Sequence, residues 1–225
     1  MNELHVGTGK EFATRLIASR RSQGHRVFSI TSKATDDPDS FTIDWNTLNM
    51  ATVHKIVSKL PALDVVVFNQ NATALSAKNF QPDHYPTLEL WKQIKDWEQA
   101  HFVSCQMPFG IIHTAKLNPG AKIVFTLSSM IVEHQFDYQY ADYMSAKYQN
   151  FMLMKNFATY RSECYFGIDP GQVTTGIATV DQFAVKTEQF EEILNRNSDD
   201  LNGRVWMLDG GGVSNITKTF GAVDK

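Results

Sequence analysis

The sequence predicts an α/β fold: a doubly wound parallel sheet of about seven strands with helices on both faces. Three observations support this prediction. The chain has 225 residues, which fits one large α/β domain. Short apolar runs alternate with helical patterns, as in proteins built on a parallel sheet. Several of these runs are apolar at successive positions, which is expected of strands covered on both faces.

The predicted strands are the apolar runs at 3–7, 26–31, 41–44, 64–69, 122–127, 164–169 and 204–209. Helical patterns lie between them, near 11–22, 47–59, 88–116, 143–161 and 183–196. No repeat and no Pro/Gly/Ser-rich linker divides the chain, so we expect a single domain over 1–225. Folds of this kind bind ligands beyond the carboxyl ends of the strands, and the functional residues are expected there.

Charge, cysteine content and hydropathy narrow the possible functions. The formal charge of −3 gives no basic excess, so we expect neither a nucleic-acid partner nor a membrane-surface partner. Cys105 and Cys164 lack metal-ligand spacing, and the seven histidines form no HxxxH or HxH pair, so no metal is expected. We find no signal segment and no apolar run of about 18 residues, which predicts a cytoplasmic protein.

The first strand–helix connection contains glycines. The segment LHVGTGKEFATRLIASRRSQGHRV (4–27) has the layout strand, glycine-bearing turn, helix, glycine and strand. Glycine lets a backbone approach a pyrophosphate closely, and the N-terminus of the next helix attracts negative charge. The full GxGxxG pattern is absent. These residues alone therefore fit a dinucleotide site and an ordinary tight turn about equally well.

The segment YMSAK places Tyr143 and Lys147 four residues apart, on one face of a predicted helix. A tyrosine ordinarily titrates near pKa ~10, and acid–base work near neutrality needs a pKa about 3 units lower, or roughly 4 kcal/mol. An ammonium about 4 Å away supplies on the order of 4 kcal/mol at an effective dielectric of ~20. An isolated Tyr–Lys pair on a helix more often lies on the solvated surface than in an active site. The neighbouring motifs decide between these two interpretations.

Three further motifs accompany this pair. The strand KIVFTLSS (122–129) ends in hydroxyls just upstream, Ser145 lies inside the Tyr–Lys interval, and DPGQVTT (169–175) follows the next strand. NGRVWMLDGGG (202–212) then closes the series near the C-terminus. In this order the motifs resemble those of the short-chain dehydrogenase/reductase family, which has a Rossmann fold, over essentially the whole chain.

The resemblance implies a catalytic set. Tyr143 would donate a proton to a substrate carbonyl in reduction, or remove one from an alcohol in oxidation. Lys147 would lower the pKa of Tyr143 and bind the nicotinamide ribose hydroxyls. Ser128 would polarise the carbonyl oxygen, with Ser129 as the alternate because counting back from the tyrosine selects it. Ser104 replaces the catalytic asparagine of the family and would hold a water of a proton relay.

The resemblance also implies a nicotinamide dinucleotide, bound through degenerate motifs. Glu11 replaces the middle glycine of the glycine-rich turn, and its carboxylate either points away or opposes the pyrophosphate. Gln70 and Asn71 replace the small residues of the NNAG motif of the family. The implied cofactor-binding residues are Gly7, Gly9, Lys10, Phe12, Thr31, Ser32, Lys33, Asp44, Trp45, Asn69, Gln70, Asn71, Tyr143, Lys147, Pro170, Gly171, Val173 and Thr175.

The charges near the second strand favour NADP(H) over NAD(H). Lys10, Ser32 and Lys33 provide ammonium and hydroxyl groups that suit a 2′-phosphate. An acid for the ribose 2′-hydroxyl would fall near Thr31, and none is there.

Substrate and partners follow from the resemblance only in outline. A lid over the substrate is expected at about 174–200, with Phe183 and Phe190 as candidate anchors, and the substrate would be a small carbonyl or alcohol. In this family the helix that carries the Tyr–Lys pair (143–161 here) commonly packs against its mate in another subunit, which implies a homodimer or homotetramer. Two hypotheses remain: an NADP(H)-dependent oxidoreductase, or a cofactor-sensing scaffold with weak or no turnover, motivated by Glu11, Ser104 and the motif FNQNA.

Overall fold

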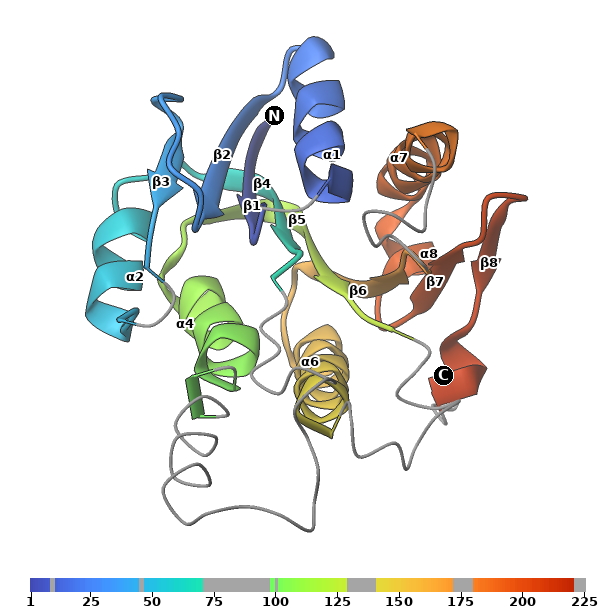
Figure 1. Ribbon diagram of the computed structural model, residues 1–225. Coiled ribbons are helices and arrows are strands. Elements are labelled where there is room, and N and C mark those ends of the chain that lie inside the picture. Colours follow the sequence, from blue (N-terminus) through green and yellow to red (C-terminus); the bar gives the residue numbers. More distant parts are fainter. Residues whose placement is uncertain are drawn as a thin grey trace, which may run out of the picture.

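The computed structural model describes residues 1–8, 11–44, 47–70, 98–99, 101–128, 141–171 and 180–220. Across these residues eight strands form one sheet in the order β3-β2-β1-β4-β5-β6-β7-β8 (Figure 1). Every neighbouring pair from β3 to β7 is parallel, and β8 runs antiparallel to β7. The predicted doubly wound parallel sheet is confirmed, with β8 as an edge strand that the sequence patterns did not indicate.

The strands are β1 (Asn2–Val6), β2 (Arg26–Thr31), β3 (Ser40–Thr42), β4 (Leu63–Phe68), β5 (Leu117–Thr126), β6 (Cys164–Asp169), β7 (Val205–Leu208) and β8 (Val213–Asn215). The α-helices are α1 (Glu11–Ser22), α2 (Met50–Val57), α4 (Met107–Thr114), α6 (Ala141–Tyr160), α7 (Val180–Leu194) and α8 (Ser198–Leu201). A π-helical turn, η1 (Phe102–Gln106), precedes α4, and a short 3₁₀ helix, η3 (Thr217–Phe220), follows β8.

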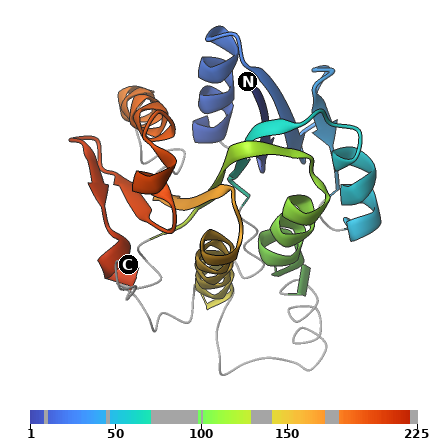
Figure 2. The same cartoon turned by 180° about the vertical axis from the view of Figure 1, so that it is seen from behind.

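Helices cover both faces of the sheet, with α1 and α7 on one side and α2, α4 and α6 on the other (Figures 1 and 2). Alternate strand residues feed two apolar cores. In β4, Val66 and Phe68 belong to the core under α2, α4 and α6, while Val65 and Val67 belong to the core under α1 and α7. This two-sided burial explains why the strand sequences are apolar at successive positions.

Three elements begin at other residues than the sequence predicted: α2, β5 and α7. The helix expected at 47–59 begins at Met50, because the Asn49 side chain caps it and accepts a hydrogen bond from the Thr52 N–H at 3.0 Å. Strand β5 begins at Leu117 instead of residue 122, and a register shift between Leu63 and Val65 of β4 accommodates the extension. The helix predicted from residue 183 begins earlier, at Val180.

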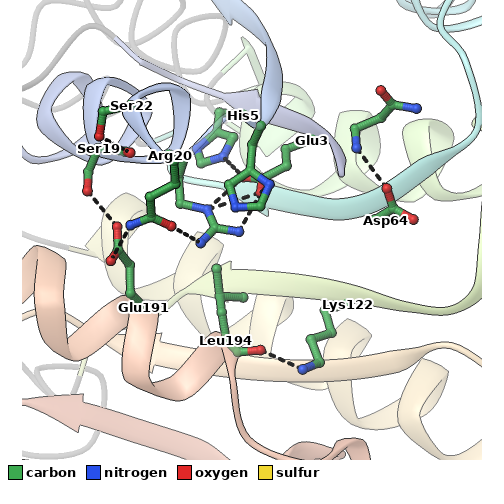
Figure 3. A network of polar contacts seen from close by, with 12 residues as sticks. Glu3, His5, Ser19, Arg20, Ser22, Asp64, Lys122, Glu191 and Leu194 are labelled. Atoms are coloured by element: carbon green, nitrogen blue, oxygen red, sulfur yellow. Dashed lines mark hydrogen bonds and ion pairs between the residues drawn. The ribbon is translucent and has the colours of Figure 1, made fainter.

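Strand β1 was predicted as an apolar run, but it carries two buried charged or titratable side chains. Glu3 and His5 are both fully buried on the side of the sheet that α1 covers (Figure 3). Arg20 of α1 donates to the Glu3 carboxylate from Nη2 at 2.6 Å and from Nε at 3.0 Å, and His5 Nε2 lies 3.1 Å from the other Glu3 oxygen. The carboxylate therefore has polar partners on two sides, as a buried charge requires.

The same network joins α1 to α7. Gln23 accepts a hydrogen bond from Arg20 Nη1 at 3.2 Å and donates one to Glu191 at 2.6 Å, and Ser19 donates to the second oxygen of Glu191 at 2.6 Å (Figure 3). Burial raises the pKa of Glu3, but the hydrogen bonds from His5 and Arg20 outweigh it and hold the pKa at about 2. The network thus depends on an ionised Glu3.

We predict that Glu3→Gln lowers the free energy of unfolding at pH 7 by about 3 kcal/mol, because it leaves a buried guanidinium without its counter-charge. The depressed pKa of Glu3 means that its contribution is present above about pH 4.5 and is lost as the pH falls towards about 2. Urea unfolding of the variant and the wild-type protein should therefore converge in that acidic range.

The matched control is Glu191→Gln, at the less buried end of the same network, where we expect a loss below about 1 kcal/mol. A loss in Glu3→Gln that stays constant from pH 7 to acid would contradict the prediction.

Candidate active site

Several residues predicted for the site come together at the carboxyl ends of β1, β4, β5 and β6. Backbone hydrogen bonds continue past these strand ends, from Asn69 N to Val6 O at 2.9 Å and from Leu127 N to Ile168 O at 2.7 Å. The side chains that leave the strands there are consequently fixed relative to one another. This edge lies at the reversal of strand order between β1 and β4, where doubly wound sheets bind ligands.

Gly7 occupies a position that only glycine fits. Its φ is +81°, and a Cβ added there would lie 2.3 Å from the Cα atom of Gln70. The turn after β1 therefore lies directly on the backbone that leaves β4. Gly9 and Lys10, which follow in this turn, lie outside the described residues.

The two side chains at the start of α1 have partners within the protein. The Glu11 carboxylate accepts a hydrogen bond from Arg15 Nε at 2.7 Å, one turn further along the helix, and both side chains are partly exposed. Phe12 is buried against Phe190 of α7, with ring centroids 6.4 Å apart, so only its backbone remains for cofactor contact. The same contact makes Phe190 a core residue that anchors α7, not an open wall of a substrate cleft.

The end of β4 carries two buried amides with unused hydrogen-bonding capacity. Asn69 Oδ1 accepts a hydrogen bond from Thr126 Oγ1 at 2.8 Å, but its Nδ2 has no partner among the described residues. Gln70 is 3% exposed, and neither its Oε1 nor its Nε2 has a partner there. Buried polar atoms without partners are costly and are expected where a ligand supplies the missing bonds. Asn71 lies outside the described residues.

Lys147 is a buried cation at the end of β5. It is 3% exposed, and its Nζ donates to the Thr126 carbonyl at 2.6 Å. Burial lowers the pKa of Lys147 to about 8, against the opposing influence of Asp169 and Cys105. Lysines with perturbed pKa values of this kind concentrate at functional sites.

Ser128 and Tyr143 are both close to Lys147 in the order of the structural elements: Ser128 follows β5, and Tyr143 belongs to α6. Ser128 is buried two residues beyond Thr126, the residue whose carbonyl accepts the Lys147 hydrogen bond. Tyr143 lies one turn before Lys147 in α6, but its side chain, like all of Ser129, lies outside the described residues. The structure thus brings Ser128 and Lys147 to one strand end and puts Tyr143 on the helix that carries the lysine.

Ser104 lies in the middle of η1, and its buried Oγ has no partner among the described residues. The π geometry includes a hydrogen bond from Met107 N–H to the Phe102 carbonyl. A signal for it exists in the sequence, because Pro108 has no N–H and cannot make the α-helical bond to the Ser104 carbonyl. Cys105 Sγ lies 3.6 Å from the Ala146 carbonyl and joins η1 to α6.

The residues predicted to meet a 2′-phosphate follow β2. Ser32 and Lys33 are exposed, while Thr31 is buried and accepts a hydrogen bond from the Lys33 N–H at 3.1 Å. Asp44 is exposed and accepts a hydrogen bond from Thr47 at 3.2 Å. Trp45 lies outside the described residues. Lys33 is thus open to an anion at this edge.

The loop after β6 begins with a buried acid. Asp169 is 2% exposed, and its Oδ1 accepts a hydrogen bond from the Gly171 N–H at 2.8 Å. Pro170 is buried and Gly171 is exposed with a φ of +60°, so the chain turns sharply here. Val173 and Thr175 lie outside the described residues. The motif DPG was identified from the sequence, but the burial of its acid was not.

Metal-ligand clusters and membrane-length helices were sought in the described part of the chain. Within it, no three His, Cys, Asp or Glu side chains gather as a metal site would need. Within the same residues, no helix combines the length and the apolar character that crossing a bilayer demands.

Known structures share this architecture. A short-chain dehydrogenase/reductase from Serratia marcescens is 17% identical and superimposes with a TM-score of 0.71 over 93% of this chain and 96% of that one. The chain has the short-chain dehydrogenase/reductase fold. Two other proteins with a similar fold are BdcA in complex with NADPH (14% identity, TM-score 0.67, 94% and 93% of the two chains) and lin1944 from Listeria innocua (14%, 0.65, 92% and 99%). Neither a family model nor a curated protein sequence matches the chain.

The resemblance stated from the motifs is therefore confirmed at the level of the fold. Identities of 14–17% do not carry the activity, the cofactor or the site residues of those proteins to this one. Support for a site in this chain therefore comes from its own structure. It contains the buried Lys147, the buried Ser128 after β5, and amide atoms after β4 that have no partner among the described residues.

We predict that Gly7→Ala lowers the free energy of unfolding by more than about 2 kcal/mol, because the new Cβ collides with the Gln70 backbone in addition to the cost of a positive φ. Gly24→Ala is the matched control. Its φ is +83° and no atom lies within 4 Å of the added Cβ, so it isolates the backbone cost of about 1 kcal/mol. Equal losses in urea unfolding would show that the contact with Gln70 contributes nothing.

Proposed function

We propose that the protein is an NADP(H)-dependent oxidoreductase that transfers hydride between the nicotinamide and a small carbonyl or alcohol substrate. The observation that carries the proposal is the burial of the Lys147 ammonium against the Thr126 carbonyl, two residues before the buried Ser128 at the carboxyl end of β5. Burying a cation costs stability, so a buried lysine is expected mainly where a function keeps it there. Its position on α6, one turn after Tyr143, fits a lysine that lowers the pKa of a tyrosine.

The edge also fits a dinucleotide. Gly7 brings the first turn onto the backbone after β4. Asn69 Nδ2 and both amide atoms of Gln70 have no partner among the described residues, and they would offer hydrogen bonds to a ligand. Lys33 and Ser32 would contact the 2′-phosphate of NADP(H), and Lys147 the hydroxyls of the nicotinamide ribose. For the predicted residues outside the described part of the chain (Gly9, Lys10, Trp45, Asn71, Val173 and Thr175), the resemblance alone supports the assignment.

The acid–base chemistry falls to the residues of α6, β5 and η1. When bound, the nicotinamide supplies or accepts the hydride. Tyr143 moves the proton at the substrate oxygen, and the Lys147 charge lowers the pKa of its hydroxyl. Ser128 donates a hydrogen bond to the same oxygen and orients it. Ser104 Oγ, which has no partner among the described residues, is suited to hold a water that replenishes the proton.

A second function, cofactor sensing without turnover, is supported by the bulky Gln70 in place of a small residue. Saturable quenching or enhancement of NADPH fluorescence without substrate turnover would favour it. The absence of saturable binding by NADPH and NADH would remove both proposals.

We further propose a homodimer or homotetramer formed through the outer face of α4 and α6. A groove of about 630 Å³ lies between these helices, η1 and α2, and its lining includes Met50, Cys105, Phe109 and Met152. Phe109, Met152 and the nearby Tyr148 are exposed large apolar or aromatic side chains. Apolar surface gathered in this way is typical of contact sites between proteins.

We predict that Tyr143→Phe abolishes turnover while the affinity for NADPH stays within a few-fold of wild type, because only the proton-carrying oxygen is removed. Steady-state rates and fluorescence titration measure the two quantities. Tyr148→Phe, an exposed tyrosine on the same helix, is the control and should retain full activity. Unchanged kinetics in Tyr143→Phe would remove this residue from the mechanism.

We predict that Lys33→Glu weakens NADPH binding by about 100-fold and NADH binding by less than about 5-fold, because the charge reversal repels only a ligand with a 2′-phosphate. Paired fluorescence titrations at one ionic strength provide the measurement. Lys59→Glu is the control, since this exposed lysine follows α2 and precedes the amino end of β4. A similar loss for both cofactors would show that Lys33 does not read the phosphate.

A further inference from the structure

Lys186 is a buried lysine on α7 that the proposed catalytic set does not use. Its Nζ donates hydrogen bonds to the carbonyls of Pro170 and Leu208, the latter at 2.7 Å. Pro170 directly follows β6, and Leu208 is the last residue of β7. One ammonium group therefore bridges the carboxyl ends of two neighbouring strands, at the edge of the sheet where the candidate site lies.

The two strands stop bonding to each other at this point. In the β6–β7 ladder the Gly167 N–H donates to the Arg204 carbonyl at 2.8 Å. Bonds of this direction recur at every second residue of a parallel ladder, so the series would reach the Gly171 N–H and the Leu208 carbonyl two steps later. The paired register of β6 and β7 ends before that bond.

Side chains take both groups of the bond that the ladder leaves out. The Gly171 N–H donates to Asp169 Oδ1 at 2.8 Å, and the Leu208 carbonyl accepts from Lys186. Gly171 has a φ of +60°, so the chain turns out of the strand direction here. A Cβ added at Gly171 would lie 3.3 Å from Lys186 Nζ and 3.8 Å from the Leu208 oxygen. The turn is therefore folded closely around the ammonium.

The helix that carries this ammonium is anchored in the core. Phe190, Ile193 and Leu194 of α7 belong to the apolar cluster under α1 and α7. Gln189 also ties α7 to the loop after β7, because its Nε2 donates to the Gly212 carbonyl at 2.7 Å. The amine of Lys186 is thus presented from a fixed helix, and the turn after β6 is held against it.

We propose that Lys186 is a positioning residue that fixes the Pro170–Gly171 turn at the ends of β6 and β7 and thereby sets the affinity for the dinucleotide. The inference rests on the proposed function, which assigns Pro170 and Gly171 to the cofactor. An ammonium suits this role because its three N–H groups can bind carbonyls of two strands at once. Hydrogen bonds from a charged donor are also about twice as strong as those from a neutral donor.

The experiment measures the motion of the Gly171 amide by ¹⁵N relaxation in the full-length protein without cofactor. Lys186→Met keeps most of the apolar stem and removes the ammonium. The Gly171 N–H should have an order parameter of about 0.85 in the wild-type protein and about 0.6 or less in Lys186→Met. Fluorescence titration should show NADPH binding weakened by about 10-fold, because two hydrogen bonds from a charged donor no longer hold the turn.

Lys122→Met is the matched control. Lys122 also fastens α7, but at the carboxyl end of the helix, where its Nζ donates to the Leu194 and Arg196 carbonyls at 2.5 and 2.8 Å (Figure 3). This variant should change neither the Gly171 order parameter nor the affinity for NADPH. Equal effects of the two lysine variants, or an unchanged order parameter in Lys186→Met, would overturn the inference.

Gly171→Ala tests the same turn if Lys186→Met does not fold, as judged by circular dichroism. Its Cβ would press on the ammonium, and NADPH binding should weaken by about 10-fold or more. Gly203→Ala is its control, because Gly203 has a φ of +75° at the amino end of β7 and its added Cβ would meet only ordinary contacts at 3.6 Å. Equal losses of NADPH affinity in the two variants would contradict a special role for the Gly171 turn.

The chemical shift of the wild-type Gly171 amide separates this inference from the proposed function. It should move on saturation with NADPH, while that of the Gly203 amide should not. Saturable NADPH binding without a shift at Gly171 would disprove the inference and leave the proposed function standing. Absence of NADPH binding would remove the proposed function and the effect on affinity with it, whereas the relaxation comparison would still decide whether Lys186 fixes the turn.

Discussion

A lysine ammonium held out of water at the end of β5 is the feature on which the rest of the site depends. Its hydrogen bond to the Thr126 carbonyl holds the side chain against the sheet. The position of that carbonyl is in turn set by the pairing of β5 with β4 and β6. The position of Lys147 therefore inherits the rigidity of the parallel sheet, and α6 supplies the direction from which the side chain arrives.

Polar groups are buried in two parts of the fold. On β1 and α1, Arg20 and His5 Nε2 bond the Glu3 carboxylate, and the group joins α1 to the sheet and, through Gln23, to α7. At the carboxyl ends of the strands, Asn69 Nδ2, the Gln70 amide and Ser104 Oγ have no partner among the described residues, and the same holds for His5 Nδ1 in the first group. Buried polar groups that bond one another support stability, whereas unmatched groups at the strand ends are suited to a ligand.

Much of the fold could be predicted from the sequence, because strands covered on both faces leave an unbroken apolar run. VVVF in β4 and CYFGI in β6 were found in this way. Glu3 and His5 were missed, since their burial is made possible by Arg20, far from them along the chain, and no local pattern records that pairing. Strand β8 was missed because Val213–Asn215 is too short to show a period.

The candidate site was predictable to a similar degree. Spacing was enough to nominate Lys147 and the serine after β5. The burial of Lys186 was not predicted, because it depends on hydrogen bonds to the carbonyls of Pro170 and Leu208, which are distant along the chain. The π-helical turn around Ser104 had a signal in Pro108, although a missing N–H indicates only that the α-helical ladder is interrupted and not how the chain resolves it.

Both edges of the sheet are short. Strands β3 and β8 have three residues each, and most of their side chains are at least partly exposed. A longer edge strand would expose more unpaired N–H and C=O groups, to which a strand of another chain could bond. With three residues each, β3 and β8 expose few such groups. Within the described residues, the sheet edges therefore offer copies of this protein little to join, and the helix faces, whose backbones are already satisfied, are the better suited surfaces for assembly.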